Sequence, residues 1–249
     1  MPILVCVSDY ERFALVVDSE TAVLGSCAIR LLDLGIDVLY TNDVDEAALL
    51  ARQEAERLGA VLIPANFERA VVDALISRVC SQLEVGPQGL IVAGAAPAAE
   101  FIEYLRARGV AWCLWDPYEM RELRFVMAAA MSTKHTSERR KHLRIPIEMQ
   151  TTVFMGRHRK DVTVHDLSQG GAYFATPHPF LEGSQLRVEL PLPGGSVMGK
   201  AEVVNAKTAD KPGRADVPEG MGVAFREFAP DADAALGRFI DDWIGRFRM

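Results

Sequence analysis

The chain has 249 residues, 49% of them hydrophobic and 24% charged, and carries a formal net charge of −7. These values predict a folded soluble protein that is long enough for two domains. No run approaches the roughly 20 apolar residues that span a bilayer. The opening segment MPILVCV is short, lacks a basic lead-in and precedes acidic residues, unlike a signal peptide. We therefore expect a cytoplasmic protein.

Four cysteines, Cys6, Cys27, Cys80 and Cys113, lie far apart in apolar segments and form no CxxC motif. This spacing predicts reduced thiols in the protein core, as expected in a reducing compartment. It argues against a zinc site. We expect the chain to carry neither a metal nor a cofactor.

The charge is distributed unevenly along the chain. Residues 1–130 hold 10 arginines and no lysine against 19 acidic residues, whereas residues 131–249 hold 17 basic and 15 acidic residues. The segment MSTKHTSERR, which begins at Met131, is polar and lacks an apolar period, as is typical of a linker. The sequence therefore predicts a domain at 1–130, a linker at 131–137 and a second domain at 138–249.

The first domain alternates short apolar runs with helical patterns. The apolar runs are typical of buried parallel strands and cover 13–17, 37–41, 60–65, 89–94 and 111–115. Helical patterns cover 21–35, 45–59, 68–84, 98–109 and 118–131. Gly35, Gly59 and Gly109 follow three of these helices, where a C-terminal cap is expected. This alternation predicts a doubly wound α/β fold of the receiver or flavodoxin type. The MPILVCV segment is left as a candidate extra strand.

The order of these elements resembles the receiver domain of two-component response regulators, and LWDPYEMREL resembles the end of its fifth strand and its fifth helix. The chemistry that the resemblance implies is missing. A receiver needs an acid pair, an aspartate that accepts phosphate, a hydroxyl residue and a lysine. Here Asp18 stands beside Ser19, and the other three positions fall on Pro64, Gly94 and Asp116. We expect a pseudo-receiver that serves as a scaffold or dimerisation domain, in which Asp18 keeps no role.

A basic run begins the second domain. Residues 131–160 contain eight lysines and arginines against Glu138 and Glu148, and charge alone favours a solvated linker. However, Arg140 and Arg144 stand four residues apart, with Arg139 adjacent, directly before a β-rich region. This spacing favours a binding function.

A second motif follows about twenty residues later in VTVHDLSQGGAYF. Alternation predicts a strand, from which Asp166 and Ser168 project on one face. Gly170 and Gly171 allow a sharp turn and a close approach of the backbone to a flat or bulky group. Because neighbours on a strand point to opposite faces, His165 and Asp166 are not expected to form an acid–base dyad, and His165 is expected at the surface.

Taken together, RxxxR followed by DxSxxG resembles the PilZ domain, a family of receptors for the bacterial second messenger cyclic di-GMP. The resemblance covers residues 138–249 and includes GMGVAF at 220–225. It implies a six-stranded β barrel. The segment 186–206 has the pattern of a hairpin, and an amphipathic helix is predicted from Asp231, with Leu236, Phe239, Ile240 and Trp243 on one side.

The resemblance also implies the binding residues. Cyclic di-GMP carries two phosphodiester charges and two guanines, and arginine can donate in pairs to phosphate oxygens or to guanine and can stack on the purine. An aspartate accepts from guanine N1 and N2, a serine bonds phosphate or base, and glycine leaves room for the ring. The predicted cyclic di-GMP site consists of Arg139, Arg140, Arg144, Asp166, Ser168, Gly170 and Gly171.

We therefore expect a bacterial signalling protein, not an enzyme, that senses cyclic di-GMP and changes its interdomain arrangement. It would signal to an unidentified protein partner through the pseudo-receiver, in a process such as motility. The sequence leaves open whether the chain forms a homodimer. Two alternatives remain: a PilZ-type adaptor that binds no nucleotide, and a response regulator with a DNA-binding output. The net charge of −7 and the lack of a visible helix-turn-helix pattern argue against a DNA-binding function.

Overall fold

The computed structural model describes residues 12–84, 86–132, 142–208 and 217–249. The candidate strand MPILVCV, Cys6, Arg139 and Arg140 lie outside the described residues. The chain divides into two compact units, one made of residues 1–139 together with Phe247–Met249 and the other of residues 140–246. Among the described residues, no helix has the length and apolar character needed to cross a bilayer.

The N-terminal unit is a doubly wound α/β fold. Its strands are β1 (Phe13–Val17), β2 (Asp37–Thr41), β3 (Leu58–Pro64), β4 (Leu90–Gly94) and β5 (Trp112–Trp115). Its helices are α1 (Gly25–Asp33), α2 (Val44–Gln53), α3 (Arg69–Arg78), α4 (Ala99–Ala107) and α5 (Met120–Ala130), with 3-10 turns at Cys80–Gln82 and Gly86–Gly89. The parallel strands run in the order β2-β1-β3-β4-β5, the flavodoxin-like order that receivers share. The predicted fold class is confirmed.

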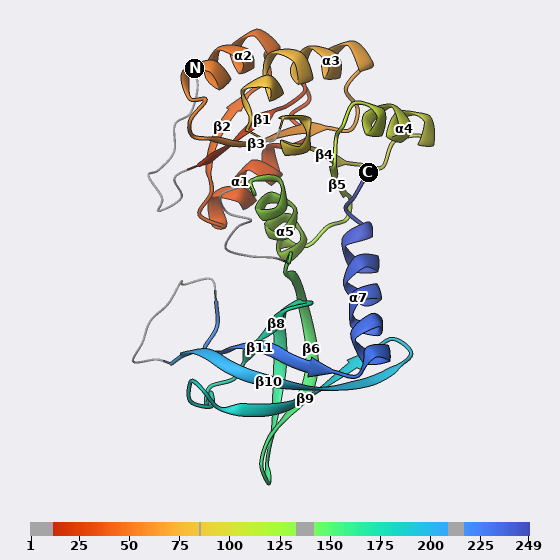
Figure 1. Ribbon diagram of the computed structural model, residues 1–249. Coiled ribbons are helices and arrows are strands. Elements are labelled where there is room, and N and C mark those ends of the chain that lie inside the picture. Colours follow the sequence, from red (N-terminus) through yellow and green to blue (C-terminus); the bar gives the residue numbers. More distant parts are fainter. Residues whose placement is uncertain (1–11, 85, 133–141, 209–216) are drawn as a thin grey trace. The chain divides into compact units, whose positions relative to one another are not determined.

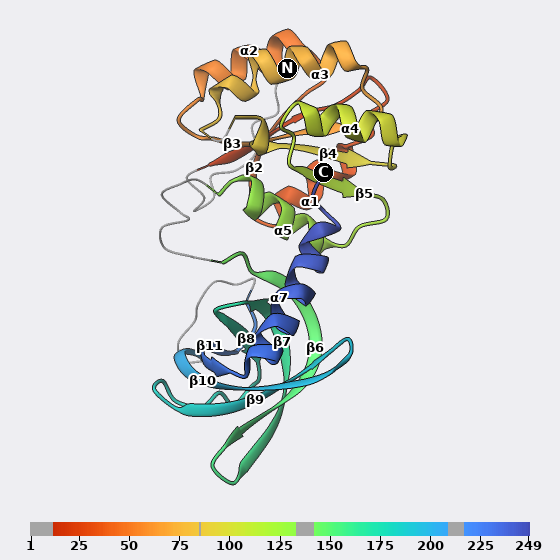
Figure 2. The same cartoon turned by 45° about the vertical axis from the view of Figure 1, so that its right-hand side comes forward.

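Helices cover both faces of this sheet, which explains why its strands are apolar throughout. Figures 1 and 2 show α2 and α3 on one face and α1 and α5 on the other. Every residue of β1, β3 and β4 is buried. Burial on both faces removes the alternation of polar and apolar residues that a half-exposed strand would show.

Two of the three predicted glycine caps are confirmed. Gly35 and Gly109 follow α1 and α4 with φ of +73° and +81°, the left-handed conformation that glycine adopts at helix ends. The prediction for Gly59 was wrong, because Gly59 is the second residue of β3. Helix α2 ends at Gln53, and Leu58 already pairs with Phe13 of β1.

The last three residues of the chain extend this sheet at its β5 edge. Arg248 forms an antiparallel bridge with Trp112. The backbone N–H of Cys113 donates to the Phe247 carbonyl at 2.9 Å, and that of Met249 donates to the Ala111 carbonyl at 3.1 Å. The N-terminal unit is therefore completed by residues from the far end of the sequence.

The three described cysteines are free and buried. Burial raises the pKa of the Cys80 thiol to about 12 and that of the Cys113 thiol to about 11. Burial also raises the pKa of Cys27. These thiols are therefore protonated at neutral pH and belong to the core, as the sequence predicted for them.

The second unit is a closed barrel of six strands followed by a helix. Its elements are β6 (Ile145–Met155), β7 (His158–Ser168), β8 (Gly171–Ala175), β9 (Gln185–Leu192), β10 (Gly195–Lys207), β11 (Gly220–Phe228) and α7 (Pro230–Gly245). The strands are antiparallel and close in the order β10-β11-β8-β7-β6-β9 (Figure 2). This confirms the predicted barrel and terminal helix.

The core of the barrel is formed by the inward-facing side chains of the strands and by the apolar face of helix α7. Along β9, buried residues at every second position face inward, as in a strand with one wet face. Helix α7 contacts β6, β9 and β10 and buries Leu236, Ile240 and Ile244, which lie four residues apart. Phe239 and Trp243, which the sequence predicted on the same side, are only half-buried and flank this stripe.

Candidate ligand-binding site

The register of β6 and β7 brings the two predicted binding motifs together. Ile145 pairs with Leu167, and Pro146 pairs with Asp166. Arg144 directly precedes Ile145 and is exposed, so the backbone of Arg144 reaches the barrel beside the DxSxxG segment. Although the motifs are about twenty residues apart in sequence, the antiparallel pairing makes them neighbours.

A second contact joins the same two segments at the β7–β8 turn. A Cβ added to Gly170 would lie 3.3 Å from Cδ2 of His142, which is the first described residue of the segment that leads into β6. The turn is held from its other side, since the backbone N–H of Phe225 in β11 donates to the Gly170 carbonyl at 3.0 Å. Gly170 therefore allows close packing of the arginine-bearing segment on the barrel.

Gly171 has a structural reason to be glycine. It is the first residue of β8 and is buried. A Cβ at this position would overlap the carbonyl oxygen of Val223 in β11, because the two backbones approach closely there. The predicted function of Gly171, leaving room for a ligand ring, stays a prediction beside this packing requirement.

Ser168 is buried, with 4% of its surface exposed. Its hydroxyl donates to the Gly171 carbonyl at 3.1 Å and so closes the β7–β8 turn. Because a hydroxyl has one proton but two lone pairs, it would have to redirect that proton in order to donate to a phosphate. A ligand contact by Ser168 stays a prediction.

The expectation that His165 and Asp166 point apart was wrong. Nδ1 of His165 lies 3.0 Å from Oδ2 of Asp166, and both side chains are about three-quarters buried, with 24% and 22% exposed. The reason is an irregularity in the strand: Val164 pairs with Phe174 and Asp166 pairs with Tyr173, which leaves His165 as an extra residue on β7. Such a bulge bends the strand and breaks the two-residue alternation of side chains.

An aromatic residue of β8 packs behind this pair. The rings of His165 and Tyr173 meet edge to face with centroids 6.1 Å apart. The Tyr173 hydroxyl donates to the Pro218 carbonyl at 2.7 Å. Burial raises the pKa of Tyr173, and the nearby charges of Asp166 and Glu219 raise it further. Sequence reasoning missed Tyr173, because nothing in the motif marks the residue that packs on its histidine.

The family comparison agrees with this geometry. The family model of the PilZ domain matches residues 138–242, a range that contains all the predicted binding residues and the six strands of the barrel. Residues 138–242 form a PilZ domain. No match was found among curated proteins.

Solved structures resemble each unit at low identity. For the PilZ domain, the Bacillus subtilis inhibitor of motility MotI/DgrA is 18% identical with a TM-score of 0.36, over 43% of this chain and 52% of that one. The match therefore spans about half of that protein. The PilZ domain with c-di-GMP of YcgR from Escherichia coli is 17% identical with a TM-score of 0.33, over 43% of this chain and 93% of that one. For the N-terminal unit, Vibrio cholerae chemotaxis protein CheY4 is 20% identical with a TM-score of 0.38, over 45% and 92%.

Outside the PilZ domain, the carboxyl ends of the parallel strands lack receiver chemistry at the predicted positions. Pro64 ends β3, Gly94 ends β4, and Asp116 follows β5 with its N–H donating to the Gly94 carbonyl at 2.9 Å. The end of β3, where the resemblance implies an aspartate that accepts phosphate, carries Pro64 instead. Among the described residues, no group of three or more His, Cys, Asp or Glu is arranged to hold a metal.

Asp18, which was expected to have no role, has a structural one. It is 1% exposed and directly follows the last residue of β1. Its Oδ1 accepts from the Ser19 N–H at 2.7 Å, and its Oδ2 accepts from the Leu24 N–H at 2.7 Å and the Tyr40 hydroxyl at 2.6 Å. The carboxylate therefore closes the loop between β1 and α1.

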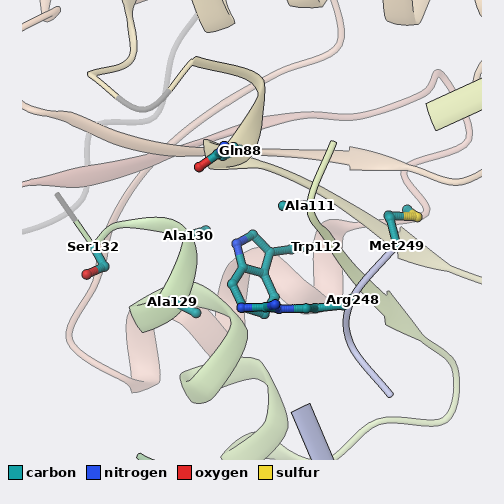
Figure 3. A pocket seen from close by; sticks show the side chains of 8 residues that line it. All are labelled: Gln88, Ala111, Trp112, Ala129, Ala130, Ser132, Arg248 and Met249. Atoms are coloured by element: carbon teal, nitrogen blue, oxygen red, sulfur yellow. The ribbon is translucent and has the colours of Figure 1, made fainter. Parts of the chain in front are cut away.

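A pocket of about 310 Å³ lies in the N-terminal unit (Figure 3). The guanidinium of Arg248 lies over the Trp112 ring, 5.5 Å from its centroid (Figure 3). The lining residues are Gln88, Ala111, Trp112, Ala129, Ala130, Ser132, Arg248 and Met249. None of them belongs to the predicted ligand site, and Arg248 is the one ionisable side chain among them, so we assign no chemistry to this pocket.

Proposed function

We propose that the chain is a receptor for cyclic di-GMP that binds the nucleotide at its PilZ domain and passes the signal to a protein partner. The observation that carries the proposal is the β6–β7 register, which sets the segment of Arg144 beside Asp166 within a matched PilZ domain. A guanidinium beside a carboxylate supplies the donors for phosphate and the acceptor for guanine N1 and N2. The solved PilZ domain of YcgR, which contains c-di-GMP, supports this choice of ligand.

The chain division supports a response that involves both units. In the sequence, the predicted ligand-binding motif that ends at Arg144 directly follows the predicted linker at 131–137. A nucleotide bound by that motif would therefore act on the segment that connects the units. We infer that binding changes the interdomain arrangement, so that the N-terminal unit presents a different surface to its partner.

Calorimetric titration of the full chain with cyclic di-GMP tests the ligand, with cyclic di-AMP and GTP as controls. We expect cyclic di-GMP to bind saturably. The other two nucleotides should neither saturate the protein nor release comparable heat. Absence of binding would overturn the receptor proposal and leave an adaptor that engages its partner constitutively. Equal binding of cyclic di-AMP would show that the site reads phosphate without reading guanine.

Small-angle scattering tests the proposed response in the same protein. We expect the scattering profile of the nucleotide-saturated chain to differ from that of the free chain at equal concentration. GTP provides the matched control, since it adds phosphate and guanine without cyclic geometry. Identical profiles under saturation by cyclic di-GMP would refute the interdomain change while leaving the binding proposal intact.

A further inference from the structure

His165 and Asp166 form a hydrogen-bonded pair. Asp166 belongs to the predicted nucleotide site, whereas His165 has not been assigned a function in it. The 3.0 Å distance between Nδ1 and Oδ2 is within the range of an N–H···O hydrogen bond. Pro146 pairs with Asp166, so the pair lies two residues along the ladder from Arg144. The bond therefore involves a carboxylate of the predicted nucleotide site.

The histidine is itself held in place. Its ring packs edge to face on Tyr173, and Tyr173 is anchored by its hydroxyl to the Pro218 carbonyl. Tyr173 is 7% exposed, which leaves its ring little freedom to move. Because His165 is three-quarters buried between this ring and Asp166, its imidazole has a defined orientation. A neutral imidazole that donates through Nδ1 is the Nδ1–H tautomer.

We propose that His165 is a positioning residue for guanine recognition: its Nδ1–H fixes the orientation in which the Asp166 carboxylate meets the guanine edge. The inference rests on the proposed function. A carboxylate only accepts hydrogen bonds, and guanine offers donors at N1 and N2, whereas adenine has an acceptor at N1. A site whose acceptor is held in this orientation disfavours adenine, since the N1 acceptor of adenine would meet the carboxylate with no proton between them. His165 therefore contributes to selectivity as well as affinity.

Two substitutions at one position separate the hydrogen bond from the packing. His165→Phe keeps an aromatic ring against Tyr173 but removes the donor. His165→Asn places an amide N–H close to where Nδ1 stands and restores the donor with a smaller side chain. His158→Asn is the matched control, because His158 is an exposed residue at the opposite end of the same strand. Each full-length protein is titrated calorimetrically with cyclic di-GMP and with cyclic di-AMP.

We expect His165→Phe to bind cyclic di-GMP about 10-fold more weakly than the wild type, because it loses one hydrogen bond to a charged group. It should also discriminate less against cyclic di-AMP. His165→Asn should stay within about 3-fold of the wild type, like the His158→Asn control. A purely structural role predicts the reverse order, since phenylalanine preserves the packing better than asparagine does.

The outcomes distinguish this inference from the function on which it rests. Cyclic di-GMP binding by the wild type with equal affinity for His165→Phe would refute the positioning role alone. If the wild type does not bind, both proposals fail together. One measurement needs no nucleotide: nitrogen-15 spectra of the free protein should show a proton on Nδ1 of His165. The Nε2–H tautomer would overturn the inference whatever the binding data show.

Discussion

Replacing Arg144 with alanine is expected to weaken cyclic di-GMP binding by about 100-fold or more, the largest effect we expect on function. Arg144 is exposed and stands directly before the residue that pairs with Leu167, which sets it beside the DxSxxG segment. A guanidinium can donate two parallel hydrogen bonds to a phosphate or to guanine O6 and N7, and each charge-assisted bond contributes about 1.5–3 kcal/mol. Two such bonds correspond to a loss of at least about 100-fold.

Two further variants test whether the loss comes from geometry or from charge alone. Arg144→Lys keeps the charge without the planar fork, so we expect it to bind at least about 10-fold more weakly than the wild type. Arg159→Ala removes one positive charge at the far hairpin of the barrel, where Arg159 is exposed and pairs with Asp161 at 3.3 Å. We expect this control to stay within about 2-fold, because an exposed charge at a distance is screened. Near-wild-type affinity for Arg144→Ala in calorimetry would refute the site assignment.

The elements that the sequence predicted well are those in which one local pattern decides the structure. The buried strands of the N-terminal unit appear as apolar runs because helices cover both faces of the sheet. The hairpin predicted at 186–206 is marked in the sequence by its turn residues, such as Gly194, which has φ +96° between β9 and β10. The PilZ domain was recognised because the residue types and the order of its two motifs are specific.

The features that the sequence did not predict depend on contacts between distant segments. The orientation of His165 follows from the register of β7 against β8, which no local pattern encodes. The clash that a side chain at Gly171 would make is with the backbone of Val223 in β11, 52 residues later. Likewise, the assignment of Gly59 to a helix end was wrong because pairing with β1 extended β3 over residues that a helix pattern also fits.

The boundary of the N-terminal unit is the clearest case of such long-range dependence. Composition and charge predicted that this domain ends near residue 130, and the C-terminal end of the chain was assigned to the barrel domain. The contacts instead place Phe247–Met249 in the N-terminal unit, where they pair with β5. A three-residue segment with a single β-bridge has no recognisable period, so its partner cannot be inferred from the sequence.

Phe247→Ala is accordingly expected to destabilise the N-terminal unit by about 3 kcal/mol, the typical cost of deleting a buried phenylalanine ring. Phe247 is 4% exposed, and its ring centroid lies 5.9 Å from that of Phe125, which in turn meets Trp112 edge to face at 5.9 Å. Truncation would leave a cavity against Phe125 and weaken the pairing of the C-terminal segment with β5. Urea unfolding of the full chain, followed by circular dichroism and by tryptophan fluorescence, measures the effect.

The matched control is Arg248→Ala, which alters the same segment at an exposed side chain. Its cation–π contact with Trp112 contributes at most about 1 kcal/mol at an exposed site, so this variant should unfold close to the wild type. If Phe247→Ala also unfolds within about 0.5 kcal/mol of the wild type, which is the range of ordinary surface substitutions, the C-terminal segment is not a structural part of the N-terminal unit. If it destabilises as expected, a truncated N-terminal unit that lacks residues 247–249 should be less stable than the same unit within the full chain, because its β5 edge and Phe125 would lose their partners.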